Sequence, residues 1–243
     1  MDQEKLAQLQ RWIDESENLV FFRGAGVSTE SGIPDFRSVD GLYNQSYRYP
    51  PETIISHSFF EADPLEFFRF YREKMLWPQA RPNPAHRKLA QLEQAGKLRA
   101  VVTQNIDGLH QAAGSRNVLE LHGSVHRNYC MRCHKSYPMQ AILDSDGVPR
   151  CSCGGTIKPD VVLYEEALDQ ATLNAALAAI EACDMLIIGG TSLAVYPAAS
   201  LVHYYRGSRL VLLNKSPTPY DSSADLVIAQ PIGALLDQIQ VRQ

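Results

Sequence analysis

The sequence predicts an α/β protein built on a doubly wound, mainly parallel sheet, with a smaller lobe inserted beside it. Short apolar runs such as Leu19-Val20-Phe21-Phe22 recur along the chain, and helical patterns separate many of them. Continuous rather than alternating apolarity indicates strands that are buried on both faces, which is typical of parallel sheets. Strands and helices in alternation indicate a doubly wound arrangement.

The elements follow one another in a regular order. An amphipathic helix is expected first, over 4–17, because apolar residues recur there at helical spacing. The strands are expected at 19–22, 100–103, 118–121, 161–164, 185–188, 210–213 and 226–228. The later helices are expected at 84–95, 169–182, 197–205 and 232–239.

Two stretches interrupt this rhythm and predict the inserted lobe. Residues 35–76 are rich in aromatic side chains and proline, and residues 123–160 contain four cysteines. We therefore expect a Rossmann-like nucleotide-binding domain made of 1–34, 77–122 and 161–243, and a small lobe made of a helical module, 35–76, and a metal-binding module, 123–160. Ligands of doubly wound folds bind beyond the carboxyl ends of the strands, so a lobe inserted there would roof a cleft.

Composition limits the classes of protein to consider. With 243 residues, 45% of them hydrophobic, the chain can bury a sizeable core. The formal net charge of -4 offers no general basic surface for phosphates, so no specific nucleic acid is expected. No apolar run approaches the roughly 18 residues that span a bilayer, and the start Met-Asp-Gln-Glu-Lys lacks a signal-peptide pattern, so no membrane association is expected. Five cysteines, an odd number, fit a reducing compartment, and we expect a cytoplasmic monomer.

Four of the cysteines form two tight pairs, Cys130 with Cys133 and Cys151 with Cys153, with 17 residues between the pairs. This spacing approaches a four-thiolate zinc pattern, whose usual form has C-x-x-C at both ends. Here the second pair is one residue short. A site filled by four sulfurs leaves no open position for water, so its zinc would be structural and catalysis would lie elsewhere. Disulfides, buried thiols and His134 as a substitute ligand are the alternatives.

A glycine turn, Gly24-Ala25-Gly26, follows the first predicted strand, where nucleotide-binding folds place such a turn. Glycine would serve there for positive φ and for close approach of backbone N–H groups to phosphate. Thr29 stands where the usual dinucleotide fingerprint has its third glycine, and no acidic residue on a second strand about twenty residues later is evident. An ordinary dehydrogenase is therefore disfavoured, and a simple strand-to-helix turn stays open.

Longer motifs carry a specific resemblance. The chain has Gly-Ala-Gly-Val-Ser-Thr-Glu-Ser-Gly-Ile-Pro-Asp-Phe-Arg at 24–37, Thr-Gln-Asn-Ile-Asp-Gly-Leu-His at 103–110, Leu-His-Gly at 121–123 and Gly-Thr-Ser-Leu at 190–193. With the paired cysteines between the last two, the chain resembles the sirtuin family, bacterial type and core domain only, over nearly its whole length. The resemblance implies an NAD-dependent protein-lysine deacetylase, a transferase that removes acetyl or other neutral acyl groups and releases nicotinamide and O-acyl-ADP-ribose. The implied cofactors are NAD and zinc, and the implied partners are proteins or peptides that carry acetyl-lysine.

The resemblance assigns the catalytic positions to His122, Asn105 and Asp107. His122 matches the family's base, and an imidazole suits that work because its unperturbed pKa near 6.5 lets it accept a proton at neutral pH. Without the flanking Leu-His-Gly motif, a core or surface histidine would be the simpler interpretation. Ile106 and Asp107 match the residues that hold the nicotinamide carboxamide, an amide that needs both a donor and an acceptor.

The other roles follow the family position by position. The residues matched to NAD contacts are Gly24, Ala25, Gly26, Thr29, Phe36, Arg37, Gln104, Ile106, Asp107, His122, Thr191, Ser192, Asn214 and Ile232. For the polar residues after the later strands, capping of the strand ends is the alternative. Val161, Leu163 and Tyr164 match the segment that pairs with the substrate backbone by strand addition, with an ordinary buried strand as the alternative.

Three positions depart from the family pattern besides the short cysteine pair. Arg23 stands where a small or hydroxyl residue is common, and a charge there must reach solvent or pair with an anion. Glu165 replaces the usual glycine of the substrate segment, which leaves the geometry of the bound peptide open. Gln230-Pro231 replaces a frequent Gly-Asp, so Ile232 is carried over only as a backbone contact to adenine.

Acyl preference follows from two further matches. Family members that remove acidic acyl groups place a tyrosine and an arginine where Phe68 and Tyr71 stand here. An apolar pocket disfavours a buried carboxylate without a cation, so neutral acyl groups are expected unless the alignment slips onto Arg69 or Arg72.

The rival functions are transfer of ADP-ribose to protein and a zinc-bearing interaction module without turnover. Intact His122 favours deacylation over the first, and retention of Asn105, Asp107 and His122 argues against the second.

Overall fold

The larger lobe is built on a six-stranded parallel sheet with the strand order β3-β2-β1-β7-β8-β9. A computed structural model describes residues 3–36, 38, 41–45 and 47–242. The strands of this sheet are β1 (Leu19–Arg23), β2 (Leu98–Thr103), β3 (Val118–Glu120), β7 (Met185–Gly189), β8 (Leu210–Leu213) and β9 (Leu226–Ile228). Each neighbouring pair is parallel, so the predicted doubly wound sheet is confirmed.

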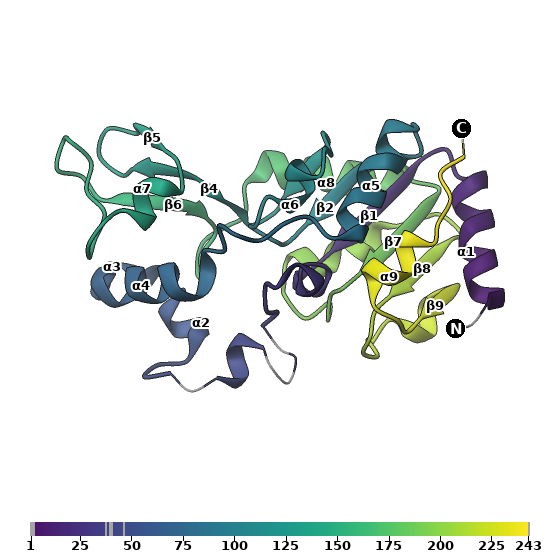
Figure 1. Ribbon diagram of the computed structural model, residues 1–243, viewed down its shortest axis with the longest axis horizontal. Coiled ribbons are helices and arrows are strands. Elements are labelled where there is room, and N and C mark those ends of the chain that lie inside the picture. Colours follow the sequence, from purple (N-terminus) through teal and green to yellow (C-terminus); the bar gives the residue numbers. More distant parts are fainter. Residues whose placement is uncertain (1–2, 37, 39–40, 46, 243) are drawn as a thin grey trace.

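Helices cover both faces of this sheet (Figure 1). One face carries α1 (Gln3–Glu15), α5 (Pro84–Gln94) and α9 (Ile232–Asp237), and the other carries α8 (Gln170–Ala182) and the 3-10 helix η5 (Ala198–Tyr204). Within β1, Phe21 packs into the first of these layers and Phe22 into the second. Since side chains alternate between two buried faces, the strand is apolar at successive positions.

The chain reverses its direction of growth across the sheet between β1 and β7, and the glycine turn lies at this switch point. Gly24 N donates to Gly189 O at 3.3 Å, and Gly26 N donates to Gly190 O at 2.8 Å. A Cβ atom on Gly26 would lie 2.8 Å from Gly190 O. Gly24 has a φ of -126°, so close packing of two turns, rather than a positive φ, requires glycine at this place. The expected need for positive φ was therefore wrong for Gly24.

The small lobe contains an antiparallel sheet of order β5-β4-β6 and a group of short helices, which lie together at one end of the molecule (Figure 1). Its strands are β4 (Gly123–Cys130), β5 (Ser136–Tyr137) and β6 (Ile157–Val161). Its helices are α2 (Pro51–Ile54), α3 (His57–Ala62), α4 (Pro64–Phe70), the π-helix η4 (Tyr71–Met75) and α7 (Gln140–Leu143). An aromatic core joins the two modules, because Phe60, Phe67 and Phe68 pack in one cluster with Val125 and Ile157.

Short helical turns complete the description of the chain. They are α6 (Leu109–Ala112), η1 (Ala25–Val27), η2 (Thr29–Ser31), η3 (Leu42–Asn44) and η6 (Asp221–Ser223). None of the helices in the described part of the chain is long and apolar enough to cross a membrane.

The strand predicted at 161–164 was wrong. β6 ends at Val161 and pairs antiparallel with β4 in the small sheet, and Tyr164 makes only an isolated bridge with Ser56. Val161 and Leu163 are buried, but they pack into the core of the small lobe. A short apolar run reveals burial without revealing which sheet or core buries it.

The contact between the two glycine turns generates a prediction about stability. Gly190 has a φ of 57°, and a Cβ there would lie 2.4 Å from Val27 N, whereas Gly32 has a φ of 83° with no heavy atom within 4 Å of its Cβ position. Gly32→Ala should lower the free energy of unfolding by about 1–2 kcal/mol through backbone strain alone. Gly190→Ala should lower the free energy of unfolding by about 1–3 kcal/mol more than Gly32→Ala does, because of the added steric overlap. Urea unfolding of both variants checks this, and equal losses would contradict the proposed packing of the turns.

Candidate functional site

A cavity of about 960 Å³ opens at the carboxyl ends of the parallel strands and is lined by residues of both lobes. The structure brings nearly all of the sequence-predicted ligand residues to this one cavity. Those lining it are Gly24, Ala25, Gly26, Thr29, Phe36, Gln104, Asn105, Ile106, Asp107, His122, Val161, Leu163, Tyr164, Thr191, Ser192, Asn214 and Ile232. Arg37 lies outside the described residues.

His122 lies in the loop between β3 and β4, where the chain leaves the large lobe for the small one. Its Nδ1 lies 2.9 Å from the backbone oxygen of Gln104. Because a carbonyl oxygen only accepts hydrogen bonds, Nδ1 carries the proton and Nε2 keeps its lone pair. Burial lowers the pKa of His122, and the bond to the Gln104 carbonyl opposes this shift. The ring is therefore a neutral base with a defined tautomer at neutral pH.

Asp107 accepts four hydrogen bonds from the protein. Oδ1 accepts from the backbone N of Leu109 at 2.9 Å and from Arg23 Nη2 at 3.4 Å, while Oδ2 accepts from Ser28 Oγ at 2.6 Å and Asn105 Nδ2 at 3.0 Å. Burial by itself would raise the pKa of Asp107. The Arg23 charge and these hydrogen bonds outweigh burial and lower the pKa to about 2. Asp107 is an anion throughout the physiological range.

The sequence predicts that a charge at Arg23 reaches solvent or pairs with an anion, and in the structure Arg23 pairs with Asp107. Its side chain is 1% exposed, and its guanidinium donates to Ser28 and Asp107. Burial lowers the pKa of Arg23, and the Asp107 carboxylate opposes that change. Sequence reasoning gave Ser28 no role, although it lies inside the glycine motif; its hydroxyl joins Arg23, Asn105 and Asp107 into one network.

Two observations test whether the cavity fits a dinucleotide. Gln104 Nε2 is buried, and none of the residues that the structure describes bonds it. Because Gln104 lines the cavity, this donor is available for an oxygen of a bound sugar. At the far side, Thr191, Ser192 and Asn214 follow β7 and β8 and also line the cavity. Asn214 Nδ2 donates to Thr191 O at 3.2 Å, so part of this polar group also has the strand-end role considered as the alternative. The donor set and the volume fit a nucleotide.

The segment after β6 forms the edge of the cavity toward the small lobe. Backbone N–H groups of this segment are already engaged: Val162 N donates to His122 O at 3.0 Å, and Leu163 N donates to the Glu166 carboxylate at 2.9 Å. Tyr164 N donates to Ile55 O at 3.1 Å. Carbonyl groups of the segment are engaged as well, because Leu163 O accepts from Glu166 N at 3.1 Å and Tyr164 O accepts from His57 N at 3.0 Å. A substrate strand would therefore rely mainly on the side chains of this segment.

Glu165 shows how the chain accommodates a residue other than glycine in this segment. Its φ is 75°, in the left-handed region that disfavours a side chain. Its carboxylate accepts from Ser58 N and Ser58 Oγ, both at 2.9 Å, and these bonds hold the conformation. Nearby, the Tyr164 hydroxyl lies 2.6 Å from the Tyr43 hydroxyl, a contact that sequence reasoning missed because the two residues are far apart in the chain.

The end of the cavity toward the aromatic core contains Tyr71, Lys74 and Met75. Arg69 is exposed and pairs with Glu66. Arg72 does not line the cavity; its guanidinium donates to the backbone oxygen of Ile142 at 2.8 Å. Lys74 does line it, a residue that the sequence analysis did not single out, and its ammonium pairs with Glu73 at 2.9 Å. Among the described residues, therefore, neither Arg69 nor Arg72 lines this end of the cavity.

The four paired cysteines form a second site in the small lobe, away from the cavity. Their sulfur atoms all lie within 4.8 Å of one another, with Cys130 and Cys153 Sγ at 3.4 Å and Cys133 and Cys151 Sγ at 3.6 Å. Four sulfurs placed tetrahedrally 2.3 Å from one ion would lie about 3.8 Å apart. The geometry thus fits zinc, and the cysteines are free thiols rather than disulfides.

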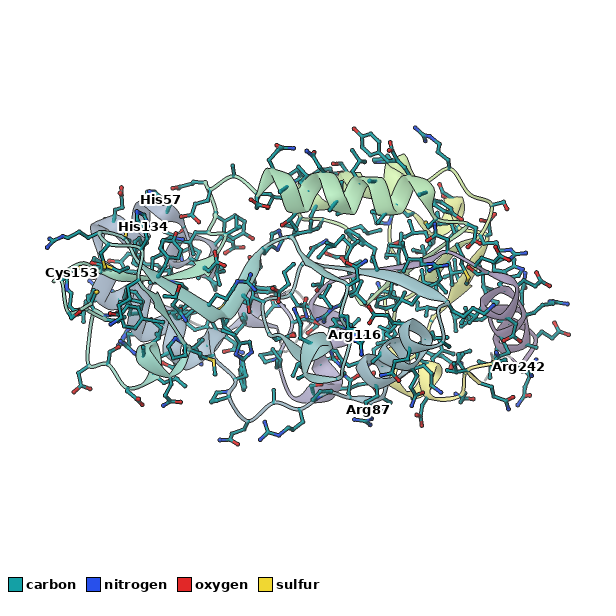
Figure 2. All side chains as sticks on the ribbon, turned by 90° about the horizontal axis from the view of Figure 1, so that it is seen from above. His57, Arg87, Arg116, His134, Cys153 and Arg242 are labelled. Carbon is teal, nitrogen blue, oxygen red and sulfur yellow. The ribbon has the colours of Figure 1, made fainter. Side chains whose placement is uncertain are left out.

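The surroundings of this cluster support a structural role. Tyr137 donates from its hydroxyl to Cys151 Sγ at 3.0 Å, a supporting contact that the sequence did not indicate. His134 is exposed and is not part of the ligand group, although Figure 2 shows it at the same end of the molecule as Cys153. Arg242 lies at the opposite end (Figure 2). A closed set of four thiolates stabilises the lobe and leaves the chemistry to the cavity.

Comparisons with known proteins agree with the geometry. The sequence pattern of the Sir2 family matches residues 24–197. The chain is 59% identical over 240 residues to an NAD-dependent protein deacetylase of Clostridium perfringens, covering 97% of this chain and 98% of that protein. A deacetylase of Cutibacterium acnes is 56% identical over 235 residues, covering 96% of each chain. Among solved structures, a Sir2 protein with a p53 peptide and NAD+ superimposes with a TM-score of 0.86 at 40% identity, covering 96% of both chains.

The cysteine cluster generates a prediction about metal content. Cys130→Ser should abolish stoichiometric zinc and unfold the small lobe, because three thiolates and a hydroxyl bind the ion much more weakly. The matched control is Cys183→Ser, since Cys183 is a buried thiol that bonds the Ile180 carbonyl outside the cluster. Elemental analysis and near-ultraviolet circular dichroism measure the two effects. Full zinc occupancy in Cys130→Ser would contradict the assignment.

Proposed function

The chain belongs to the Sir2 family, and we propose that the cavity described above carries its NAD-dependent removal of acetyl groups from protein lysines. The protein is an NAD-dependent protein deacetylase, as its relatives are named. The observation that supports the site most directly is the defined tautomer of His122 at the wall of the cavity. Bound NAD supplies an electrophilic ribose carbon and nicotinamide as its leaving group.

His122 acts as the general base. With its Nδ1 proton held by the Gln104 carbonyl, it accepts a proton at Nε2 from a hydroxyl brought into the cavity. The lowered pKa keeps the ring neutral, and so ready to accept, at neutral pH. Asn105 and Asp107 hold the reacting end of the cavity in shape through their shared hydrogen bond.

The cofactor occupies the cavity along the switch point of the sheet. Gly24, Ala25, Gly26 and Thr29 accommodate its phosphates, and Phe36 lines the cavity beside them. Arg37 stays a predicted cofactor contact from the resemblance. Gln104 contacts the ribose, and Ile106 and Asp107 contact the carboxamide of nicotinamide. The adenosine contacts are Thr191, Ser192, Asn214 and Ile232.

The substrate is a protein segment that carries acetyl-lysine. It lies along Val161, Leu163 and Tyr164 and threads the modified side chain toward His122, an arrangement supported by the presence of all four residues in the lining of one cavity.

The division of labour between the lobes is part of the proposal. The Rossmann-like domain of 1–34, 77–122 and 161–243 binds NAD, and the lobe of 35–76 and 123–160 shapes the peptide side. The protein works as a monomer on acetylated proteins and without specific nucleic acid. A cytoplasmic location stays a prediction from cysteine usage.

Removing the base tests this mechanism. His122→Ala should lower kcat for deacetylation by about 10²–10⁴-fold, the usual contribution of a general base. His203→Ala, an exposed histidine bonded to Tyr220, is the matched control and should keep full activity. The wild-type kcat should fall in acid with an apparent pKa below 6.5, because the pKa of His122 is lowered and protonation removes the base.

The product separates deacetylation from the rival reaction. Mass spectrometry should find O-acetyl-ADP-ribose in solution, whereas ADP-ribose attached to the protein substrate would favour the transfer of ADP-ribose to protein.

Acyl selectivity gives a second test. Acetyl-lysine peptides should be turned over at least about tenfold faster, in kcat/KM, than succinyl-lysine peptides, because an unpaired carboxylate in a mainly apolar pocket loses its hydration. Lys74, the cation at that end, is already paired with Glu73. Glu73→Gln should therefore reduce the ratio of kcat/KM for acetyl-lysine peptides to that for succinyl-lysine peptides, because Lys74 loses its partner and can pair with the succinyl carboxylate. Comparable rates for the two acyl groups on the wild-type enzyme would contradict the assignment of this pocket.

A further inference from the structure

Arg23, at the carboxyl end of β1, is a buried cation that the roles above leave unused. Among the described residues that line the cavity Arg23 is absent, and it reaches the cavity only through its partners. Nη1 donates to Ser28 Oγ at 2.9 Å, and Nη2 donates to Asp107 Oδ1 at 3.4 Å. Arg23 is buried and engaged by these bonds, so it does not itself contact a ligand in the cleft.

The Asp107 carboxylate has no lone pair to spare. A carboxylate offers about four acceptor positions, and Arg23, Ser28, Asn105 and the backbone of Leu109 supply one donor each. The proposed function needs this same carboxylate as the acceptor for an amide N–H of nicotinamide. One of the four donors must therefore give way when nicotinamide binds.

Arg23 is the donor that gives way. Its bond to Asp107, at 3.4 Å, is the longest of the four and exceeds the ordinary range for N–H···O bonds. Arg23 Nε is already buried with no hydrogen-bond partner among the described residues. If the ligand displaces Nη2 from Asp107, a second N–H group of the buried guanidinium is left without a hydrogen bond. The free-energy cost of this unpaired group weakens binding of the ligand.

Among the described residues around Arg23, no other anion is available to the displaced guanidinium. His86 and His110 lie beside one another with ring centroids 4.7 Å apart and ring planes tilted by 55°. Burial, followed by the charge of Arg23, lowers both pKa values, that of His86 to about 3. Both rings are therefore neutral. Glu120, which attracts Arg23 through space, is held by Arg127 at 2.7 Å.

We propose that Arg23 competes with the carboxamide of nicotinamide for Asp107, so that this enzyme binds its own product weakly and resists inhibition by it. The inference rests on the proposed role of Asp107 in holding the carboxamide. Arg23 is thus a positioning residue that acts through Asp107 on the release of nicotinamide.

The test is the inhibition constant of nicotinamide in deacetylation of an acetyl-lysine peptide by the wild type, Arg23→Thr and Arg23→Met. Both substitutions free one acceptor position on Asp107, and Arg23→Met keeps the aliphatic stem should Arg23→Thr fold poorly. The inhibition constant should fall by about fivefold or more in each variant, while KM for the peptide stays unchanged. Arg99→Met, which removes an exposed arginine of β2, is the control and should leave the inhibition constant unchanged.

A gain of affinity separates this role from a structural one, because damage to the fold would weaken binding of both nicotinamide and peptide. An unchanged or higher inhibition constant in a variant with the wild-type melting temperature overturns the inference. If the wild type fails to release nicotinamide in the presence of NAD and peptide, the proposed function fails instead. Calorimetric binding of nicotinamide to the wild type and both variants then decides the inference, with the same direction expected.

Discussion

The parallel pairing of β1 with β7 brings two turns together, and the geometry of the cavity depends on this contact. The N–H groups of Gly24 and Gly26 bond to the backbone oxygens of Gly189 and Gly190, so the glycine turn of one half of the sheet packs directly on the turn of the other. Side chains at these positions would separate the turns. Because the sheet grows in opposite directions from this point, the two turns leave a crevice between them, as in other doubly wound folds.

The cysteine-bearing module of the small lobe joins the crevice at His122. His122 is followed by Gly123, whose φ of 76° turns the chain into β4 so tightly that a Cβ there would lie 2.0 Å from Asp160 O. On the other side, His122 O accepts from Val162 N as the chain returns. The base is thus held where the two chain crossings that flank the cysteine-bearing module meet, and the thiolate cluster stiffens the sheet beyond it.

Much of this architecture could be predicted from the sequence, since continuous apolar runs reveal doubly buried strands and the cysteine spacing reveals a metal site. The failures have physical reasons. Val161 and Leu163 are as apolar as the residues of a central strand, but their burial comes from the core of the small lobe. The partner of Arg23 lies 84 positions away, and no local pattern connects Arg23 with Asp107. The left-handed backbone of Glu165 persists because Ser58, also distant in sequence, bonds its carboxylate.

The tautomer of His122 is set by a backbone oxygen rather than by a side chain. In many sites an acidic residue orients the catalytic imidazole, and exchange of that residue then disturbs the chemistry. Here every amino acid at position 104 presents the same carbonyl group, provided that the main chain keeps its course. Genetic drift next to the base can therefore alter cofactor contacts without changing which ring nitrogen is available. The tautomer of His122 is therefore insensitive to substitution at position 104, while the contacts of that side chain with the ligand can change.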